Sequence, residues 1–195
     1  MIQRVLIAGF GGQGILLIGQ ILADAAMKQG YHTTWFPSYG PEMRGGTANC
    51  TTIFSDEEIG SPISSTYDVL IAMNQPSLER FISSVRLGGA VLVNSSMVPI
   101  RCDRADVTAL HVPASDLARQ AGSERVANMV MLGTLLAVQD DLKQEWLERA
   151  VAAVVGKKHA ELIEANLAAI RAGAAYQEST DQRAPSRGNP ILASG

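Results

Sequence analysis

Three glycines, at positions 9, 11 and 14, stand between an apolar run and a helical pattern. This G-x-G-x-x-G spacing is typical of turns that hold phosphate groups. Glycine permits close approach of the backbone, and the start of the following helix offers unpaired N–H groups and the positive end of its dipole. Residues 9–14, the glycine loop, therefore predict an anion-binding turn. Its candidate binding residues are Gly9, Gly11, Gly12, Gln13 and Gly14.

A dinucleotide such as NAD requires more than these glycines. Its site also has an acidic residue about 20 positions onward, at the end of the second strand, to hold a ribose. Here that strand ends in residues 35–38 (Trp-Phe-Pro-Ser), without Asp or Glu, and Glu42 belongs to a later motif. We therefore favour an anion or cofactor site completed by another chain, with NAD binding and a ligand-free tight turn as alternatives. The amide of Gln13 suits a ligand, a neighbouring loop or solvent.

A second loop, residues 38–46 (Ser-Tyr-Gly-Pro-Glu-Met-Arg-Gly-Gly), also follows an expected strand. Loops at the carboxyl ends of strands line the ligand crevice of open α/β sheets, so the two loops are expected to be neighbours. Arg44 can clamp a phosphate or carboxylate, and Glu42 can orient it. A plain exposed ion pair is the alternative. Further candidate site residues are Ser38, Tyr39, Gly40, Glu42, Arg44, Gly45, Asn49 and Asn74.

Strand and helix patterns alternate along the chain and must position these loops. Buried strands are expected at 5–9, 31–36, 47–55, 68–73, 89–94 and 106–112, and helices at 15–30, 78–85, 113–120, 126–138, 143–155 and 158–176. This alternation predicts a three-layer α/β/α sandwich, with a Rossmann-like, mostly parallel sheet and a helical C-terminal part. We expect one domain over residues 1–177. Residues 178–195 are polar, with Pro and Gly, and we expect a flexible tail.

Composition excludes several classes of protein. The formal net charge of -3 and the absence of a basic run disfavour nucleic-acid binding. Two cysteines cannot hold an iron–sulfur cluster, and together with the absence of a signal-peptide pattern they fit a reducing cytoplasm. His32, His111 and His159 are scattered without metal-ligand spacing, so no metal site is expected. Cys50 is expected to be packed in a strand, and no apolar stretch is long enough to span a membrane.

At this point the motifs as a group resemble a known family. The glycine loop, residues 38–49 (Ser-Tyr-Gly-Pro-Glu-Met-Arg-Gly-Gly-Thr-Ala-Asn), residues 68–76 and residues 127–133 are similar to the gamma subunit of 2-oxoacid:ferredoxin oxidoreductases. The resemblance covers roughly residues 1–175. It adds Asn128, whose amide, like that of Asn49, is expected to fix a loop or meet a partner, with capping of a turn or helix as the alternative.

The resemblance implies one subunit of a multi-subunit enzyme that is not active alone, with no catalytic residue of its own. Thiamine diphosphate, Mg²⁺ and iron–sulfur clusters would belong to the alpha, beta and delta partner subunits, and ferredoxin would accept the electrons. The glycine loop and Arg44 would suit the phosphates of coenzyme A at a shared site. A stand-alone nucleotide-binding protein and a ligand-free scaffold subunit are the alternatives.

The form of the second loop resembles the 2-oxoglutarate and branched-chain enzymes more than the pyruvate enzymes. On this resemblance we favour oxidative decarboxylation of 2-oxoglutarate with CoA to succinyl-CoA. The 2-oxoisovalerate, pyruvate and indolepyruvate enzymes are the alternatives, because the substrate pocket belongs mainly to other chains.

Overall fold

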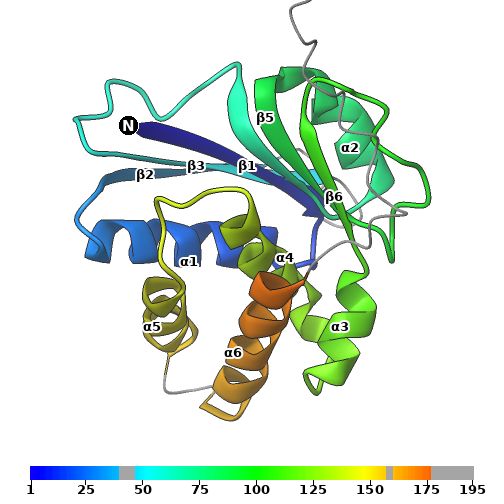
Figure 1. Ribbon diagram of the computed structural model, residues 1–195. Coiled ribbons are helices and arrows are strands. Elements are labelled where there is room, and N and C mark those ends of the chain that lie inside the picture. The colour runs from blue at the N-terminus through cyan, green and yellow to red at the C-terminus, as the bar shows by residue number, and fades with distance from the viewer. Residues whose placement is uncertain (40–46, 157–159, 177–195) are drawn as a thin grey trace, which may run out of the picture.

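The computed structural model describes residues 1–39, 47–156 and 160–176, and Figure 1 shows their arrangement. A six-stranded sheet has the order β2-β3-β1-β4-β5-β6. Its strands are β1 (Ile2–Phe10), β2 (His32–Tyr39), β3 (Thr47–Ser55), β4 (Tyr67–Ala72), β5 (Val85–Asn94) and β6 (Thr108–Val112). The continuous apolar runs in β1, β4 and β5 form the centre of the sheet because both of their faces are buried.

The sheet is mostly parallel, with one exception. β1, β4, β5 and β6 run parallel to one another, whereas β3 lies antiparallel between β1 and β2. In a regular dinucleotide fold the second strand would pair directly with the first. Here Val5 pairs with Thr52 and Trp35 also pairs with Thr52, so β3 separates the two. The mostly parallel α/β sheet is confirmed, with an antiparallel strand inserted beside β1.

The helices cover the two faces of the sheet unequally, as Figure 1 shows. α2 (Gln75–Phe81) lies on one face and packs through Leu78 with Leu70 and Val91. On the other face, α1 (Ile15–Lys28) and α4 (Ala127–Thr134) lie against the sheet, α3 (Ala114–Gln120) and α6 (Ala160–Ala175) pack on α4, and α5 (Gln144–Val155) packs on α1. α4 and α6 pack closely because Gly133 and Gly173 lack side chains: a Cβ on Gly133 would lie 2.1 Å from the Ile170 carbonyl oxygen.

The helix expected near 78–85, with Pro76 at an early helical position, is α2 followed by a 3-10 turn, Ile82–Ser84. It begins earlier, at Gln75, because the Asn74 side chain accepts a hydrogen bond from the Ser77 N–H at 2.9 Å and caps the helix there. It ends at Phe81, and β5 begins at Val85 instead of at residue 89. The expected helix at 126–138 is α4 flanked by two 3-10 turns, Glu124–Val126 and Leu135–Ala137.

Candidate functional site at the carboxyl edge of the sheet

The glycine loop is a tight turn between β1 and α1. The Gln13 N–H donates to the Phe10 carbonyl at 3.2 Å, and Gly12 and Gly14 have φ angles of 93° and 72°. Only glycine adopts these left-handed angles without strain. Gly11 and Gly12 are exposed, and no side chain caps the first N–H groups of α1, which begins after Gly14. The loop therefore presents its backbone, rather than side chains, to the outside.

The side chain of Gln13 holds this loop against the end of β4. Its Oε1 accepts hydrogen bonds from the Phe10 N–H at 2.6 Å and from Nδ2 of Asn74 at 3.4 Å, and its Nε2 donates to the Met73 carbonyl at 3.4 Å. A Cβ on Gly9 would lie 2.6 Å from the same Oε1. Of the roles expected for Gln13, these contacts favour the bond to a neighbouring loop.

Asn128, at the start of α4, braces the other end of the loop. It is only 5% exposed, its Nδ2 donates to the Gly14 carbonyl at 3.3 Å, and its Oδ1 accepts from the Met129 N–H at 2.9 Å. A Cβ on Gly14 would lie 2.2 Å from Nδ2 of Asn128. The amide thus occupies the space that a side chain at position 14 would need. This is the loop-fixing role expected for Asn128.

The strand register brings the ends of the second loop to the same edge. β3 begins with Thr47 paired to Phe10, and Ala48 is paired to both Gly9 and Tyr39. Ser38 pairs with Asn49 in the β2–β3 ladder. The expectation that the two loops are neighbours is therefore confirmed for the flanks of the second loop. The candidate residues Gly40, Glu42, Arg44 and Gly45 lie outside the described residues.

A hollow of about 320 Å³ opens beside the glycine loop, toward β5 and the starts of α3 and α4. Gly12, Gln13, Gly14 and Asn128 line it. It is also lined by residues that the sequence analysis did not single out, among them Asn94, Ser115 and Arg125. Asn94 could have been identified in the same way as Asn74, because it is the last residue of the buried strand β5. Ser115 and Arg125 carry no such local signal.

Three other residues that the sequence analysis named, Cys50, Asn74 and His111, have structural roles. Burial raises the pKa of Cys50 to about 12, so its thiol stays protonated and unreactive. Asn74 is 2% exposed and caps α2. His111 is buried, and its Nε2 accepts from the Cys102 N–H at 3.2 Å, whereas His32 is exposed on β2 and His159 lies outside the described residues. Within the described ranges, no three His, Cys, Asp or Glu side chains gather as a metal site.

No helix in the described part of the chain has the length and apolar character needed to cross a membrane.

Known proteins are similar in sequence to this chain over most of its length. Ketoisovalerate oxidoreductase subunit VorA of Methanothermobacter thermautotrophicus is 44% identical over 174 residues, which are 89% of this chain and 36% of VorA. The 2-oxoglutarate synthase subunit KorC of Methanothermobacter marburgensis is 36% identical over 142 residues, covering 69% of this chain and 76% of KorC. This chain therefore spans about a third of the length of VorA and most of KorC.

Solved structures share the fold. The gamma subunit of a keto/oxoacid ferredoxin oxidoreductase from Geobacter sulfurreducens matches with a TM-score of 0.77 and 30% identity, over 89% of this chain and 94% of that one. The 2-oxoglutarate:ferredoxin oxidoreductase of Magnetococcus marinus, solved with 2-oxoglutarate, coenzyme A and succinyl-CoA bound, matches with a TM-score of 0.80 and 28% identity. That match covers 89% of this chain and 30% of the other.

The family model for pyruvate ferredoxin/flavodoxin oxidoreductase matches residues 4–176, which include both loops and all of the helices and strands described above except the first two residues of β1. With a gamma subunit among the structures that share its fold, the chain belongs to the pyruvate ferredoxin/flavodoxin oxidoreductase family.

Proposed function

We propose that this chain is the gamma subunit of a multi-subunit 2-oxoacid:ferredoxin oxidoreductase, and that its carboxyl edge forms part of the CoA site. The enzyme decarboxylates a 2-oxoacid oxidatively, transfers the acyl group to CoA and reduces ferredoxin. The single observation that carries the proposal is the meeting of the two loops at one edge, where β3 joins the ends of β1 and β2. The CoA in the Magnetococcus marinus relative supports this choice of ligand.

The chemistry of the glycine loop suits a polyphosphate. Its exposed Gly11 and Gly12 and the uncapped start of α1 offer backbone N–H groups and the positive end of a helix dipole. Arg125 adds one cation at the adjoining hollow, although Glu124 beside it offsets that charge. Arg44 is the further cation that we assign to the CoA phosphates. In this assignment Gln13, Asn74 and Asn128 hold the glycine loop in place, and the backbone of the loop binds the CoA phosphates.

The chain depends on partners for its cofactors. Among the described residues, no cysteine or acidic cluster can hold a metal or iron–sulfur cluster. Thiamine diphosphate, Mg²⁺ and the clusters are therefore assigned to alpha, beta and delta subunits in the cytoplasm.

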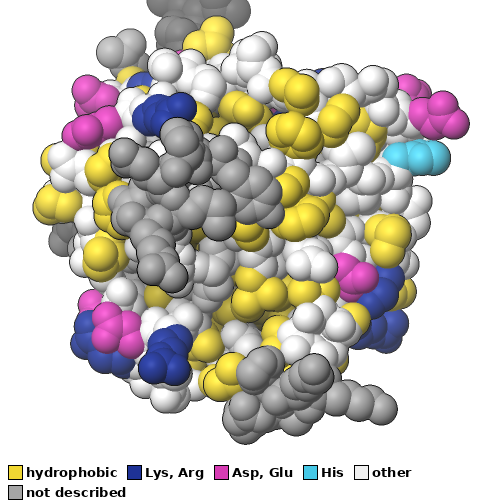
Figure 2. All heavy atoms as spheres, turned by 180° about the vertical axis from the view of Figure 1, so that it is seen from behind, with side chains coloured by type: hydrophobic (Ala, Val, Ile, Leu, Met, Phe, Trp, Pro, Cys, Tyr) yellow, Lys and Arg dark blue, Asp and Glu magenta, His cyan; other side chains and the backbone are white. Residues whose placement is uncertain are grey.

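Figure 2 shows hydrophobic side chains over the middle of one face and charged ones toward its rim, a pattern typical of protein interfaces. Exposed hydrophobic residues include Met27, Phe36, Ile63 and Leu87.

The substrate is the least determined part of the proposal. The relatives do not single out 2-oxoglutarate, because the ketoisovalerate subunit is more similar than the 2-oxoglutarate subunit, with 44% against 36% identity. We therefore place a branched-chain 2-oxoacid first and 2-oxoglutarate second. Neither choice changes the proposed role of this chain at the CoA site.

The test is the reconstituted complex, purified with its co-encoded subunits and assayed for CoA-dependent reduction of ferredoxin. 2-Oxoisovalerate, 2-oxoglutarate and pyruvate are compared as substrates. Arg44→Ala should raise the KM for CoA about tenfold, the effect of one lost charge-assisted hydrogen bond, and leave the KM for the 2-oxoacid unchanged. Arg149→Ala, an exposed arginine on α5, is the matched control.

Three outcomes would contradict the proposal. An unchanged KM for CoA in Arg44→Ala would favour a scaffold subunit. A chain that purifies alone, without thiamine-binding and cluster-containing partners, would exclude the subunit role. Tight binding of NADH to the isolated chain would support a stand-alone nucleotide-binding protein instead.

A further inference from the structure

A second pocket, of about 330 Å³, lies at the amino edge of the sheet, opposite the glycine loop. Its walls include Gln3 near the start of β1, Arg86 near the start of β5, and Gln139 and Asp140 from the segment between α4 and α5. Parallel strands place their starts and their ends at opposite edges, so this pocket is separate from the proposed CoA site. Nothing in the proposed function uses it.

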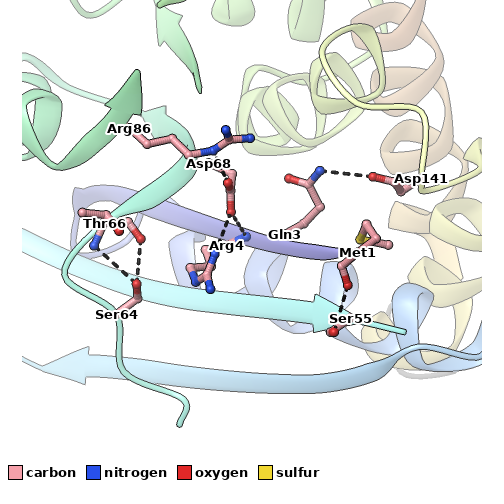
Figure 3. Close-up of polar contacts among 9 residues, drawn as sticks. All are labelled: Met1, Gln3, Arg4, Ser55, Ser64, Thr66, Asp68, Arg86 and Asp141. Carbon is pink, nitrogen blue, oxygen red and sulfur yellow. Dashed lines mark hydrogen bonds and ion pairs between the residues drawn. The ribbon is translucent and has the colours of Figure 1, made fainter. Parts of the chain in front are cut away.

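Arg86 presents a positioned cation at this pocket. Its Nε donates to the carboxylate of Asp68, whose side chain is only 6% exposed. The same carboxylate accepts from the Arg4 N–H at 2.7 Å, which fixes it in place. In Figure 3 the two terminal nitrogens of Arg86 point away from Asp68. A guanidinium held through Nε keeps its terminal pair free to bind a carboxylate in bidentate fashion.

Gln139 supplies an amide that the described part of the chain does not satisfy. It is 8% exposed, and neither its Oε1 nor its Nε2 has a hydrogen-bond partner. Leaving such a buried polar group without a partner costs about 1–3 kcal/mol. Gln139 lines the pocket while its two amide atoms lie below the surface, so a rotation of the side chain would bring them to a ligand with both donor and acceptor groups.

The remaining polar groups of the pocket are acceptors. Gln3 donates through Nε2 to Asp141 at 3.1 Å, and in Figure 3 its Oε1 points back toward the side of Arg86. Asp140 adds an exposed carboxylate. Asp68 is paired with Arg86 and lies 3.6 Å from the guanidinium of Arg4, so these two arginines and the carboxylates of Asp68 and Asp140 balance in charge. A simple anion is therefore disfavoured, whereas a ligand that carries both a carboxylate and an ammonium group matches the pocket.

We propose that the amino-edge pocket binds a free α-amino acid. The ligand carboxylate lies against the terminal nitrogens of Arg86, and its ammonium group donates to Asp140 and to the amide oxygens of Gln3 and Gln139. Nε2 of Gln139 donates to a polar group of the ligand. A volume of about 330 Å³ accommodates an amino acid with a polar side chain. L-Glutamine is the first probe, because its side-chain amide is complementary to that of Gln139.

Isothermal titration of the full-length chain with L-glutamine tests this assignment. We expect saturable binding, and weaker binding of two analogues that each lack one charge: L-glutaminamide, without the carboxylate, and 4-carbamoylbutanoate, without the ammonium group. Arg86→Lys keeps a cation beside Asp68 but removes the terminal fork, and should weaken binding about tenfold. Arg119→Lys, an exposed arginine on α3, should bind like the wild type.

Gln139→Leu gives an independent measurement. It removes the amide that lacks a partner, so the variant should lose binding while its Tm rises by several degrees. Failure of L-glutamine, L-serine and L-valine to bind the wild-type chain would overturn the proposal. So would equal binding by the Arg86→Lys variant, or equal affinity for L-glutamine and 4-carbamoylbutanoate. None of these results depends on CoA or on the partner subunits.

Discussion

At the carboxyl edge of the sheet, the amides of Gln13 and Asn128 form hydrogen bonds with the neighbouring backbone, and that of Gln13 also with Asn74. The exposed surface of the loop is glycine backbone. At the amino edge, Arg86 is held through its Nε beside a pocket, and the amide of Gln139 has no hydrogen-bond partner among the described residues. The difference shows two ways to build a binding site. The carboxyl edge presents a backbone that side-chain amides hold in shape, and the amino edge presents the end of a side chain, Arg86, held by the buried carboxylate of Asp68.

The comparison predicts that side-chain volume added to the glycine loop at the carboxyl edge lowers the stability of the fold. Gly14→Ala should have the largest effect, because Ala would adopt a φ of 72° and its Cβ would displace the Asn128 amide. We expect a loss of about 2–4 kcal/mol in the free energy of unfolding, from the strained backbone and the broken buried hydrogen bond. Urea unfolding of the purified chain measures it.

Gly12→Ala is the matched control for that experiment. Its φ of 93° also strains Ala, but nothing lies within 4 Å of the added Cβ. A loss of only about 1 kcal/mol is expected. Equal losses in the two variants would show that Asn128 does not brace the loop.

Asp68→Asn tests the amino edge in turn. The substitution removes the charge that holds Arg86 and weakens the bond from the Arg4 N–H. Because the Arg86 side chain is 55% exposed and stays solvated, the expected cost is moderate, about 1–3 kcal/mol in urea unfolding. Activity of the assembled complex with saturating CoA should change little. A large rise in the KM for CoA would contradict the separation of the two edges.

Asn128→Ala should affect the carboxyl edge more mildly than Gly14→Ala. It removes the hydrogen bond to the Gly14 carbonyl without a clash, at a cost of about 1–2 kcal/mol. The loop loses a brace, so the KM for CoA in the complex should rise while kcat stays near that of the wild type. A fall in kcat with an unchanged KM would argue against a loop that only positions CoA.

The smallest effect is expected away from both edges, where Arg171 on α6 holds Glu148 on α5 through two bonds of 2.8 and 3.0 Å. The hydrogen bond from Arg171 lowers the pKa of Glu148. Its stabilising contribution is therefore present above the unfolded pKa of about 4.3, and is lost as the pH falls through the lower folded value. Glu148→Gln should cost at most about 1 kcal/mol at neutral pH.

The pH dependence provides the check on that pair. The difference in Tm between wild type and Glu148→Gln should shrink as the pH falls below about 4. Glu145→Gln is the control, since Glu145 makes a single exposed contact with Arg149 at 3.7 Å. A difference that does not depend on pH would contradict the ion pair as its source.

Much of the fold was predictable because its signals are local. The apolar run through Val5 and Ile7, the glycines at 9 and 14, and the spacing of α1 lie within a short stretch of chain. The helix expected near 78–85 is shorter at its C-terminal end, where a 3-10 turn and then β5 follow Phe81. The assignments of the candidate site to CoA, and of residues 178–195 to a flexible tail, stay predictions.

The sequence by itself determined that a glycine turn joins a buried strand to a helix, since backbone freedom and periodicity are properties of adjacent residues. The tertiary structure alone decided that β3 lies between β1 and β2, that Asn128 fills the space above Gly14, and that Arg86 and Gln139 share a pocket. Gly14 and Asn128, and likewise Arg86 and Gln139, are more than 50 residues apart in sequence. Strand register and helix packing determine these arrangements, and no local spacing encodes either.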